Sequence, residues 1–143
     1  QNRRWLRLFQ TQHITHTMNI EFTNIPQKDE KADTFISDEI LVDTYGKEEQ
    51  LSAWYSYLED ALPFPFGGMV LTEKTKSSSC YNQVKLEGMA SVQRCGLYQM
   101  WALGRLSIDK TLVHFFLADL KSVDKMEAYQ PLYYWKYWMQ QQY

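Results

Sequence analysis

Residues 43–66 read DTYGKEEQLSAWYSYLEDALPFPF, and this stretch decides the first half of the fold. Glu48 and Glu49 lie at its start, where the positive end of a helix dipole favours anions. Pro63 ends the helical pattern, and residues 64–66 run extended because each proline biases its predecessor away from the helical region. Apolar side chains between these limits recur at spacings of three and four residues and form one stripe, at Leu51, Trp54, Tyr55, Leu58 and Leu62. The stretch predicts an amphipathic helix followed by an extended segment.

Four segments beyond this helix are typical of antiparallel strands separated by polar turns. They lie at residues 69–74, 83–90, 97–106 and 111–117. The turn at 107–110 predicts a hairpin between the last two strands, and the serine-rich residues 76–79 join the first two. Short strands of this kind curl readily into a small, half-open barrel capped by helices.

The C-terminal residues predict a second helix that packs on the barrel. Between residues 127 and 140, apolar side chains again recur at helical spacings, although Pro131 restricts where the helix begins. The predicted fold is therefore α+β, a small antiparallel β-barrel with an N-terminal amphipathic helix and a C-terminal aromatic helix.

The first 37 residues differ in composition and are expected to form an N-terminal arm and linker before a domain at 38–143. Residues 24–37 are polar and show little periodicity, which predicts a loop, and residues 39–42 (EILV) predict a short buried strand. Residues 1–17 are basic and partly apolar. They fit a mitochondrial-type targeting segment, sequence upstream of a natural start at Met18, or an arm docked on the domain, and these alternatives stay open.

Histidine and cysteine residues give no strong metal pattern. His13 and His16 could share a helical face as ligands, but no Cys or carboxylate follows at ligand spacing, so solvated tail residues are the simpler interpretation. Cys80 and Cys95 fit neither a disulfide scaffold nor a zinc motif. We expect two separate thiols, which favours an intracellular, cytoplasmic location.

Composition limits the remaining classes of function. The 143 residues carry a net charge of -2 and 15% aromatic residues, which indicates one domain with a core. No apolar run approaches the ~18 residues of a membrane span, and no cluster of Lys and Arg marks a nucleic-acid interface. An enzyme is also disfavoured, because His114 stands alone in an apolar strand and Gly67-Gly68 lacks the spacing of a phosphate-binding loop. We therefore expect no membrane partner, no nucleic-acid partner and no catalysis.

Three ordered motifs resemble the cyanobacterial calcium-binding protein (CcbP) family. They are DTYGKEE at 43–49, AWYSYLED at 53–60 and PFPF at 63–66, with fainter similarity through 100–121 and in YWKYW at 134–138. The resemblance covers residues 38–143. It implies a small α+β protein with an SH3-like barrel that binds Ca²⁺ through surface carboxylates and carbonyls without an EF-hand, and no EF-hand loop pattern occurs in the chain.

The resemblance directs attention to carboxylates that could converge on one ion, because Ca²⁺ takes about six to eight hard oxygen ligands. Glu59 and Asp60 end the predicted helix, where unpaired carbonyls point outward and a cation would relieve the unfavourable dipole. Further candidates lie before or at the start of this helix, namely Asp38, Glu39, Asp43, Glu48 and Glu49. Since the helix separates its ends by roughly 20 Å, these residues cannot all share one ion. A solvated acidic face is the alternative for each of them.

One departure from the family and one aromatic cluster keep a second function open. Residues 91–96 (SVQRCG) replace an acidic stretch that family members carry. The sequence thus predicts a non-EF-hand calcium buffer or sensor, or alternatively a non-catalytic protein-interaction module that has lost the metal. In that module, exposed aromatic rings of the C-terminal helix would form the surface that contacts a partner. The competing interpretation is that the barrel and a neighbouring helix enclose this segment on both sides and make it core. The rings are Tyr133, Tyr134, Trp135, Tyr137 and Trp138.

Overall fold

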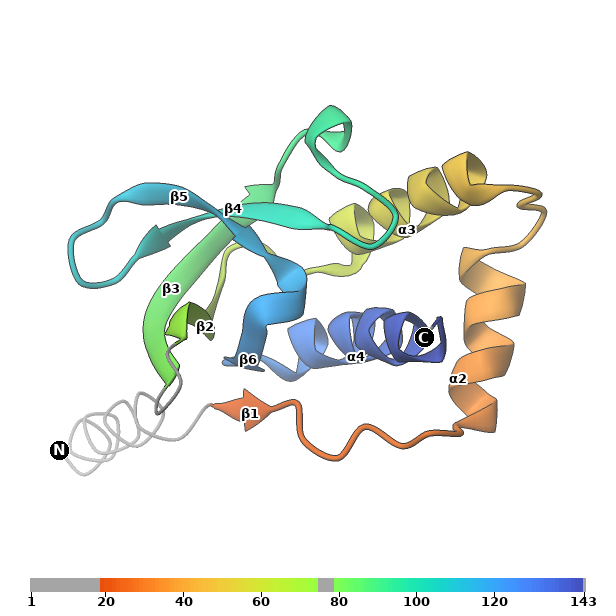
Figure 1. Ribbon diagram of the computed structural model, residues 1–143, viewed down its shortest axis with the longest axis horizontal. Helices are drawn as coiled ribbons and strands as arrows, with labels where there is room; N and C mark the ends of the chain where they lie inside the picture. Colours follow the sequence, from red (N-terminus) through yellow and green to blue (C-terminus); the bar gives the residue numbers. More distant parts are fainter. Residues whose placement is uncertain (1–18, 75–78, 143) are drawn as a thin grey trace, which may run out of the picture.

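The computed structural model describes residues 19–74 and 79–142, and within them six strands form one antiparallel sheet in the order β1-β6-β2-β3-β4-β5. Helices lie beside the sheet and cover one side of it (Figure 1). The strands are β1 (Ile20–Glu21), β2 (Phe66–Lys74), β3 (Ser79–Met89), β4 (Trp101–Leu106), β5 (Leu112–Phe116) and β6 (Leu120–Val123). The helices are α2 (Glu30–Phe35), α3 (Lys47–Ala61) and α4 (Met126–Gln141), with a π-helical turn η1 (Ile36–Ile40) and 3₁₀ turns η2 (Val92–Arg94) and η3 (Leu117–Asp119).

The predicted amphipathic helix is confirmed as α3. Trp54 and Leu58 from its apolar stripe are completely buried. At its start, the Tyr45 N–H donates to Oε1 of Glu49 over 2.7 Å, which satisfies a main-chain donor just before the first turn. The strands predicted after it and the aromatic C-terminal helix are also present, with shifted ends. The α+β class is therefore confirmed.

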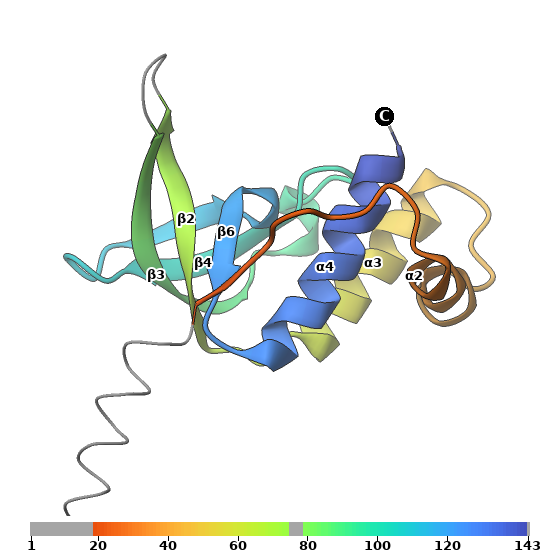
Figure 2. The ribbon, with the colours of Figure 1, turned by 90° about the horizontal axis from the view of Figure 1, so that it is seen from below.

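A closed barrel is not present among the described strands. β5 pairs only with β4, and β1 pairs only with β6, so the sheet has two free ends. The SH3-like barrel expected from the resemblance is thus not established, and the strands form an open, curved sheet (Figure 2).

Residues 24–42 correct two expectations. The interval 24–37, expected as a loop, contains α2, and residues 39–42, expected as a strand, contain the end of η1 and a turn. Ala32, Ile36 and Ile40 recur every four residues and all three are buried. The helix was missed because charged residues surround this thin apolar line. Its N-cap is Asp29, whose Oδ1 accepts the Ala32 N–H at 3.0 Å.

Part of the segment that was expected to be an arm contributes to the sheet and the core. Ile20 pairs with Val123 in β6, and the chain then runs alongside α4 to reach α2 (Figure 2). The alternatives for residues 1–17, including His13 and His16, fall outside the described residues. No helix in the described part of the chain is long and apolar enough to cross a membrane.

The aromatic helix α4 is enclosed rather than exposed. Trp135 and Tyr137 are each 1% exposed, and the rings of Trp54 and Trp135 meet edge to face with centroids 5.2 Å apart. Tyr134 is half-buried and stacks on Phe35 of α2 at 4.7 Å. These rings pack between α4 and the helices α2 and α3, and Tyr133 is half-buried as well, so the set does not form the exposed partner surface considered above.

Candidate metal centre

A groove of about 450 Å³ lies between η1 and α3 and brings together two of the candidate carboxylates, Glu39 and Asp60. Glu39 comes from η1, and Asp60 comes from the last turn of α3. The α3 residues that line the groove recur at spacings of three and four, so they form one face of the helix: Ala53, Ser56, Tyr57, Asp60 and Ala61. Glu39 and Asp60 are both exposed, and an ion in solution can reach them.

The end of α3 adds main-chain oxygens close to Asp60 in sequence. Pro63 has no N–H, so the carbonyl of Glu59 receives no hydrogen bond from the residue four positions later. The Phe64 N–H donates to the Leu62 carbonyl over 2.9 Å instead of continuing the helical pattern to Asp60. The negative end of the helix dipole therefore lies beside two adjacent carboxylates, an arrangement that favours a cation.

Glu59 and Asp60 point to different surroundings, although they were expected to act as a pair. Glu59 lies one helical turn after Tyr55, and burial together with the negative charge of Glu59 raises the pKa of the Tyr55 hydroxyl. The Tyr55 hydroxyl donates to the Ala90 carbonyl. Glu59 is thus on the flank that faces the end of β3, whereas Asp60 lines the groove with Glu39.

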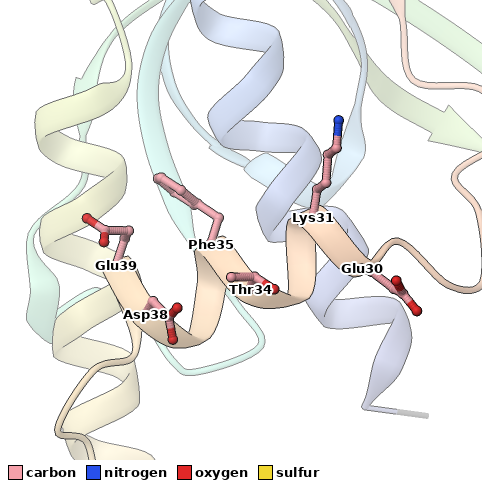
Figure 3. A pocket seen from close by; sticks show the side chains of 6 residues that line it. All are labelled: Glu30, Lys31, Thr34, Phe35, Asp38 and Glu39. Atoms are coloured by element: carbon pink, nitrogen blue, oxygen red, sulfur yellow. The ribbon is translucent and has the colours of Figure 1, made fainter.

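Asp38 belongs to a second hollow, of about 550 Å³, on the outer side of α2 and η1. Glu39 contributes to both hollows, and the outer one also includes Glu30 and Phe35. In Figure 3, Asp38 and Glu39 leave η1 on different sides, with Glu39 on the side of Phe35. The Ser37 hydroxyl donates to Oδ1 of Asp38 over 3.0 Å. Both η1 carboxylates therefore line the second hollow, and only Glu39 also lines the groove that contains Asp60.

The other three candidates lie near the start of α3. Asp43 occupies the connection before the helix with a φ of 58°, and Glu48 is exposed in the first turn. Glu49 already accepts the main-chain bond from Tyr45. A helix of this length places them roughly 20 Å from Asp60. Among the residues that the structure describes, no group of three or more His, Cys, Asp or Glu side chains is placed to hold a metal ion.

Two groove residues, Ser56 and Tyr57, were not predicted. Ser56 lies one turn before Asp60, so the same helical spacing that defines the apolar stripe could have identified it. Burial raises the pKa of Tyr57 to about 12, so its hydroxyl stays neutral and keeps its proton. Ser56 offers a neutral hydroxyl oxygen on the helix face that carries Asp60, and Tyr57 forms part of the groove wall.

A hydrogen-bonded network fixes α2 and hence the position of Glu39. The Tyr137 hydroxyl accepts the Asp29 N–H and donates to Oδ1 of Asp33, both over 2.9 Å. Lys28 forms an ion pair with Asp33 at 2.8 Å, and its hydrogen bond lowers the pKa of that carboxyl. These bonds anchor α2 to α4, and α2 continues directly into η1 and Glu39.

The region that departs from the family forms an exposed 3₁₀ turn, η2. Its basic residue, Arg94, places its guanidinium 5.8 Å from the ring centroid of Trp101. This turn supplies a cation–π contact, and no carboxylate, to the surface near the start of β4.

Comparison with known proteins identifies relatives with the same architecture. A family model described as calcium binding (CcbP) matches residues 34–139. The crystal structure of CcbP from Anabaena is 30% identical, with a TM-score of 0.71, covering 81% of this chain and 94% of that chain. A calcium-binding protein in its calcium-binding form is 28% identical, with a TM-score of 0.71, covering 85% of this chain and 98% of that chain. No curated protein matches the chain. The family expected from the motifs is confirmed, and this chain belongs to the CcbP family of calcium-binding proteins.

Proposed function

We propose that this calcium-binding protein holds Ca²⁺ in the groove between η1 and α3, with the carboxylates of Glu39 and Asp60 as its principal ligands. The main support for this site is that two candidate carboxylates from separate elements line one groove. Family membership supports calcium as the ion. The protein then acts as a buffer or sensor that uses surface oxygens and no EF-hand.

The donor chemistry of the groove suits a hard cation. Two carboxylates, the Ser56 hydroxyl and water can contribute to the about six to eight oxygens that Ca²⁺ takes, and main-chain carbonyls at the end of α3 add further acceptors. Mg²⁺ requires a stricter octahedral shell and loses water reluctantly, so an open groove of this kind favours Ca²⁺. Two exposed carboxylates predict weak binding, with a Kd on the order of 10⁻⁴ to 10⁻³ M.

The other candidate carboxylates take different roles in this proposal. Glu59 and Asp38 adjoin Asp60 and Glu39 in sequence and add negative potential that attracts the ion. Asp43, Glu48 and Glu49 lie near the opposite end of α3 and do not reach it.

We further propose a non-catalytic, cytoplasmic role. The sole histidine among the described residues, His114, is exposed and meets Trp101 edge to face with ring centroids 6.3 Å apart. The interaction module considered above required exposed rings on α4, and its support is weak because Trp135, Tyr137 and Trp138 are buried and Tyr133 and Tyr134 are half-buried.

Calorimetric titration of chelator-treated full chain with Ca²⁺ and Mg²⁺ tests the proposal. Wild type should give a saturable heat with Ca²⁺ that Mg²⁺ does not reproduce. Glu39→Gln and Asp60→Asn should each weaken Ca²⁺ binding at least about tenfold, because each removes a charged ligand. Glu48→Gln is the matched control, since it removes the same charge from the same helix at its other end. Equal affinity in all three variants would place the ion elsewhere.

A further inference from the structure

β5 leaves a row of main-chain groups at a free edge of the sheet. Two bonds flank its pairing with β4: the Leu106 N–H donates to the Thr111 carbonyl at 3.0 Å just before β5, and the Leu117 N–H just after it donates to the Met100 carbonyl at 2.9 Å. With the pairing of Phe115 and Ala102, this register directs every second residue of the strand toward β4. The N–H and C=O groups of Leu112 and His114 and the N–H of Phe116 therefore point away from β4, while the Phe116 carbonyl begins the 3₁₀ turn η3. No strand in the described part of the chain pairs with this edge.

A hollow of about 270 Å³ lies along the same edge. Val113 and His114 both line it, although successive side chains of a strand lie on opposite faces. The hollow thus reaches the edge of β5 and also extends over Trp101 and Leu106 of β4. Its other walls are mainly apolar and include Val70 and Leu71 of β2 and Phe116 of β5.

Asp119 gives this apolar hollow a negative charge. It is half-buried in η3, and desolvation raises the pKa of its carboxyl. The positive charge of Lys136 acts in the opposite direction and lowers this pKa. Its ammonium group is engaged elsewhere: it donates to the Ala118 carbonyl at 2.9 Å and lies 5.0 Å from the ring centroid of Phe22. Among the described residues, Asp119 has no ion pair within 4.0 Å. A cationic group arriving at the hollow would stabilise this carboxylate.

We propose that β5 accepts an extended peptide as an additional strand, with an apolar side chain in the hollow and a nearby Lys or Arg side chain against Asp119. Main-chain bonds to Leu112, His114 and the Phe116 N–H would give affinity, and the hollow and Asp119 would give specificity. Charge complementarity selects a basic and apolar peptide over an acidic one. This surface is separate from the calcium groove, because the two share no lining residue and β5 lies across the molecule from α2, which leads into η1 (Figure 1).

The test begins with a display selection of random octapeptides against the full chain in chelator, where the calcium site cannot contribute. Enriched peptides should share an apolar residue close to a Lys or Arg. Binding of the best peptide is then measured by fluorescence anisotropy. His114→Pro removes one outward N–H, so the peptide loses a main-chain hydrogen bond and should bind at least tenfold more weakly. The variant should still fold, because an edge strand tolerates proline where the N–H faces solvent. His114→Ala keeps the N–H and should bind within about twofold of wild type.

Asp119→Asn tests the charge separately and remains informative if His114→Pro lowers the folded fraction. It should weaken the basic peptide about fivefold and leave a version with norleucine in place of lysine unchanged. Absence of enrichment, an acidic consensus, or equal binding by His114→Pro and His114→Ala would overturn the proposal. A concentration-dependent dimer in sedimentation, abolished by His114→Pro, would also overturn it by assigning the edge to a second copy of the chain.

Discussion

The hydroxyl of Tyr133 donates a 2.6 Å hydrogen bond to Oδ2 of Asp29, which joins the start of α2 to α4 across 104 residues of sequence. Oδ1 of the same carboxylate caps α2 through the Ala32 N–H. One ionised side chain therefore both begins the helix and attaches it to the core. This attachment leads to a prediction about acid stability.

Asp29 should make the protein sensitive to acid. The bond from Tyr133 is the main cause that lowers the pKa of Asp29 below its ordinary value of 3.8. Because the folded pKa is below the unfolded one, the stabilisation is present above the unfolded value and is lost as the pH falls through the folded value. Urea unfolding at pH 7 and pH 3 should show a smaller pH dependence in Asp29→Asn than in wild type. The same loss of stability on acidification in both would contradict this role.

Trp54 should be among the most costly residues to truncate. It is completely buried and meets both Trp135 and Trp138, with ring centroids 5.2 and 5.5 Å away. Trp54→Ala should lower the free energy of unfolding by about 3 to 5 kcal/mol, because the cavity cannot fully close. Ser52→Ala, at an exposed position of the same helix, is the control and should change it by less than about 0.5 kcal/mol. Similar denaturant midpoints for the two variants would mean that the Trp54 side chain contributes little packing energy to the aromatic core.

The sequence was sufficient for α3 because its stripe combines large side chains with a clear stop at Pro63. It was insufficient for α2, where Ala32, Ile36 and Ile40 form a line of single apolar residues among charges, and for β1, which is only two residues long. The carboxylates were recognised individually. Their grouping could not be predicted, because Glu39 and Asp60 share a groove only when the turn between η1 and α3 brings the end of α3 beside η1. Local periodicity carries no information about that turn's direction.

The predicted domain boundary at residue 38 can be tested by truncation. A chain of residues 38–143 lacks Ala32 and Ile36, which are 1% and 5% exposed in the core, and lacks β1 at the edge of β6. Loss of this apolar burial should cost at least about 2 kcal/mol. Ile36→Ala in the full chain separates packing from chain length and should cost about 2 to 5 kcal/mol. A truncated chain with wild-type midpoint and cooperativity would restore the original boundary and show that α2 only rests on the surface.

Substitutions at Glu59 and Asp60 can distinguish a carboxylate that binds the ion from an adjacent carboxylate that does not. They are adjacent, exposed and equally charged, but Asp60 lines the groove with Glu39 while Glu59 lies on the side of Tyr55. Asp60→Asn should therefore reduce calcium affinity at least about tenfold, and Glu59→Gln should reduce it by no more than about threefold through the lost field alone. Both changes relieve the same conflict with the helix dipole, so the stability of the calcium-free protein should stay equal or rise slightly in each. Calcium titrations and thermal melts of the two variants, side by side, check these expectations. Equal weakening would mean that both carboxylates bind the ion, whereas a large loss of calcium-free stability in Asp60→Asn would show that its carboxylate holds the fold.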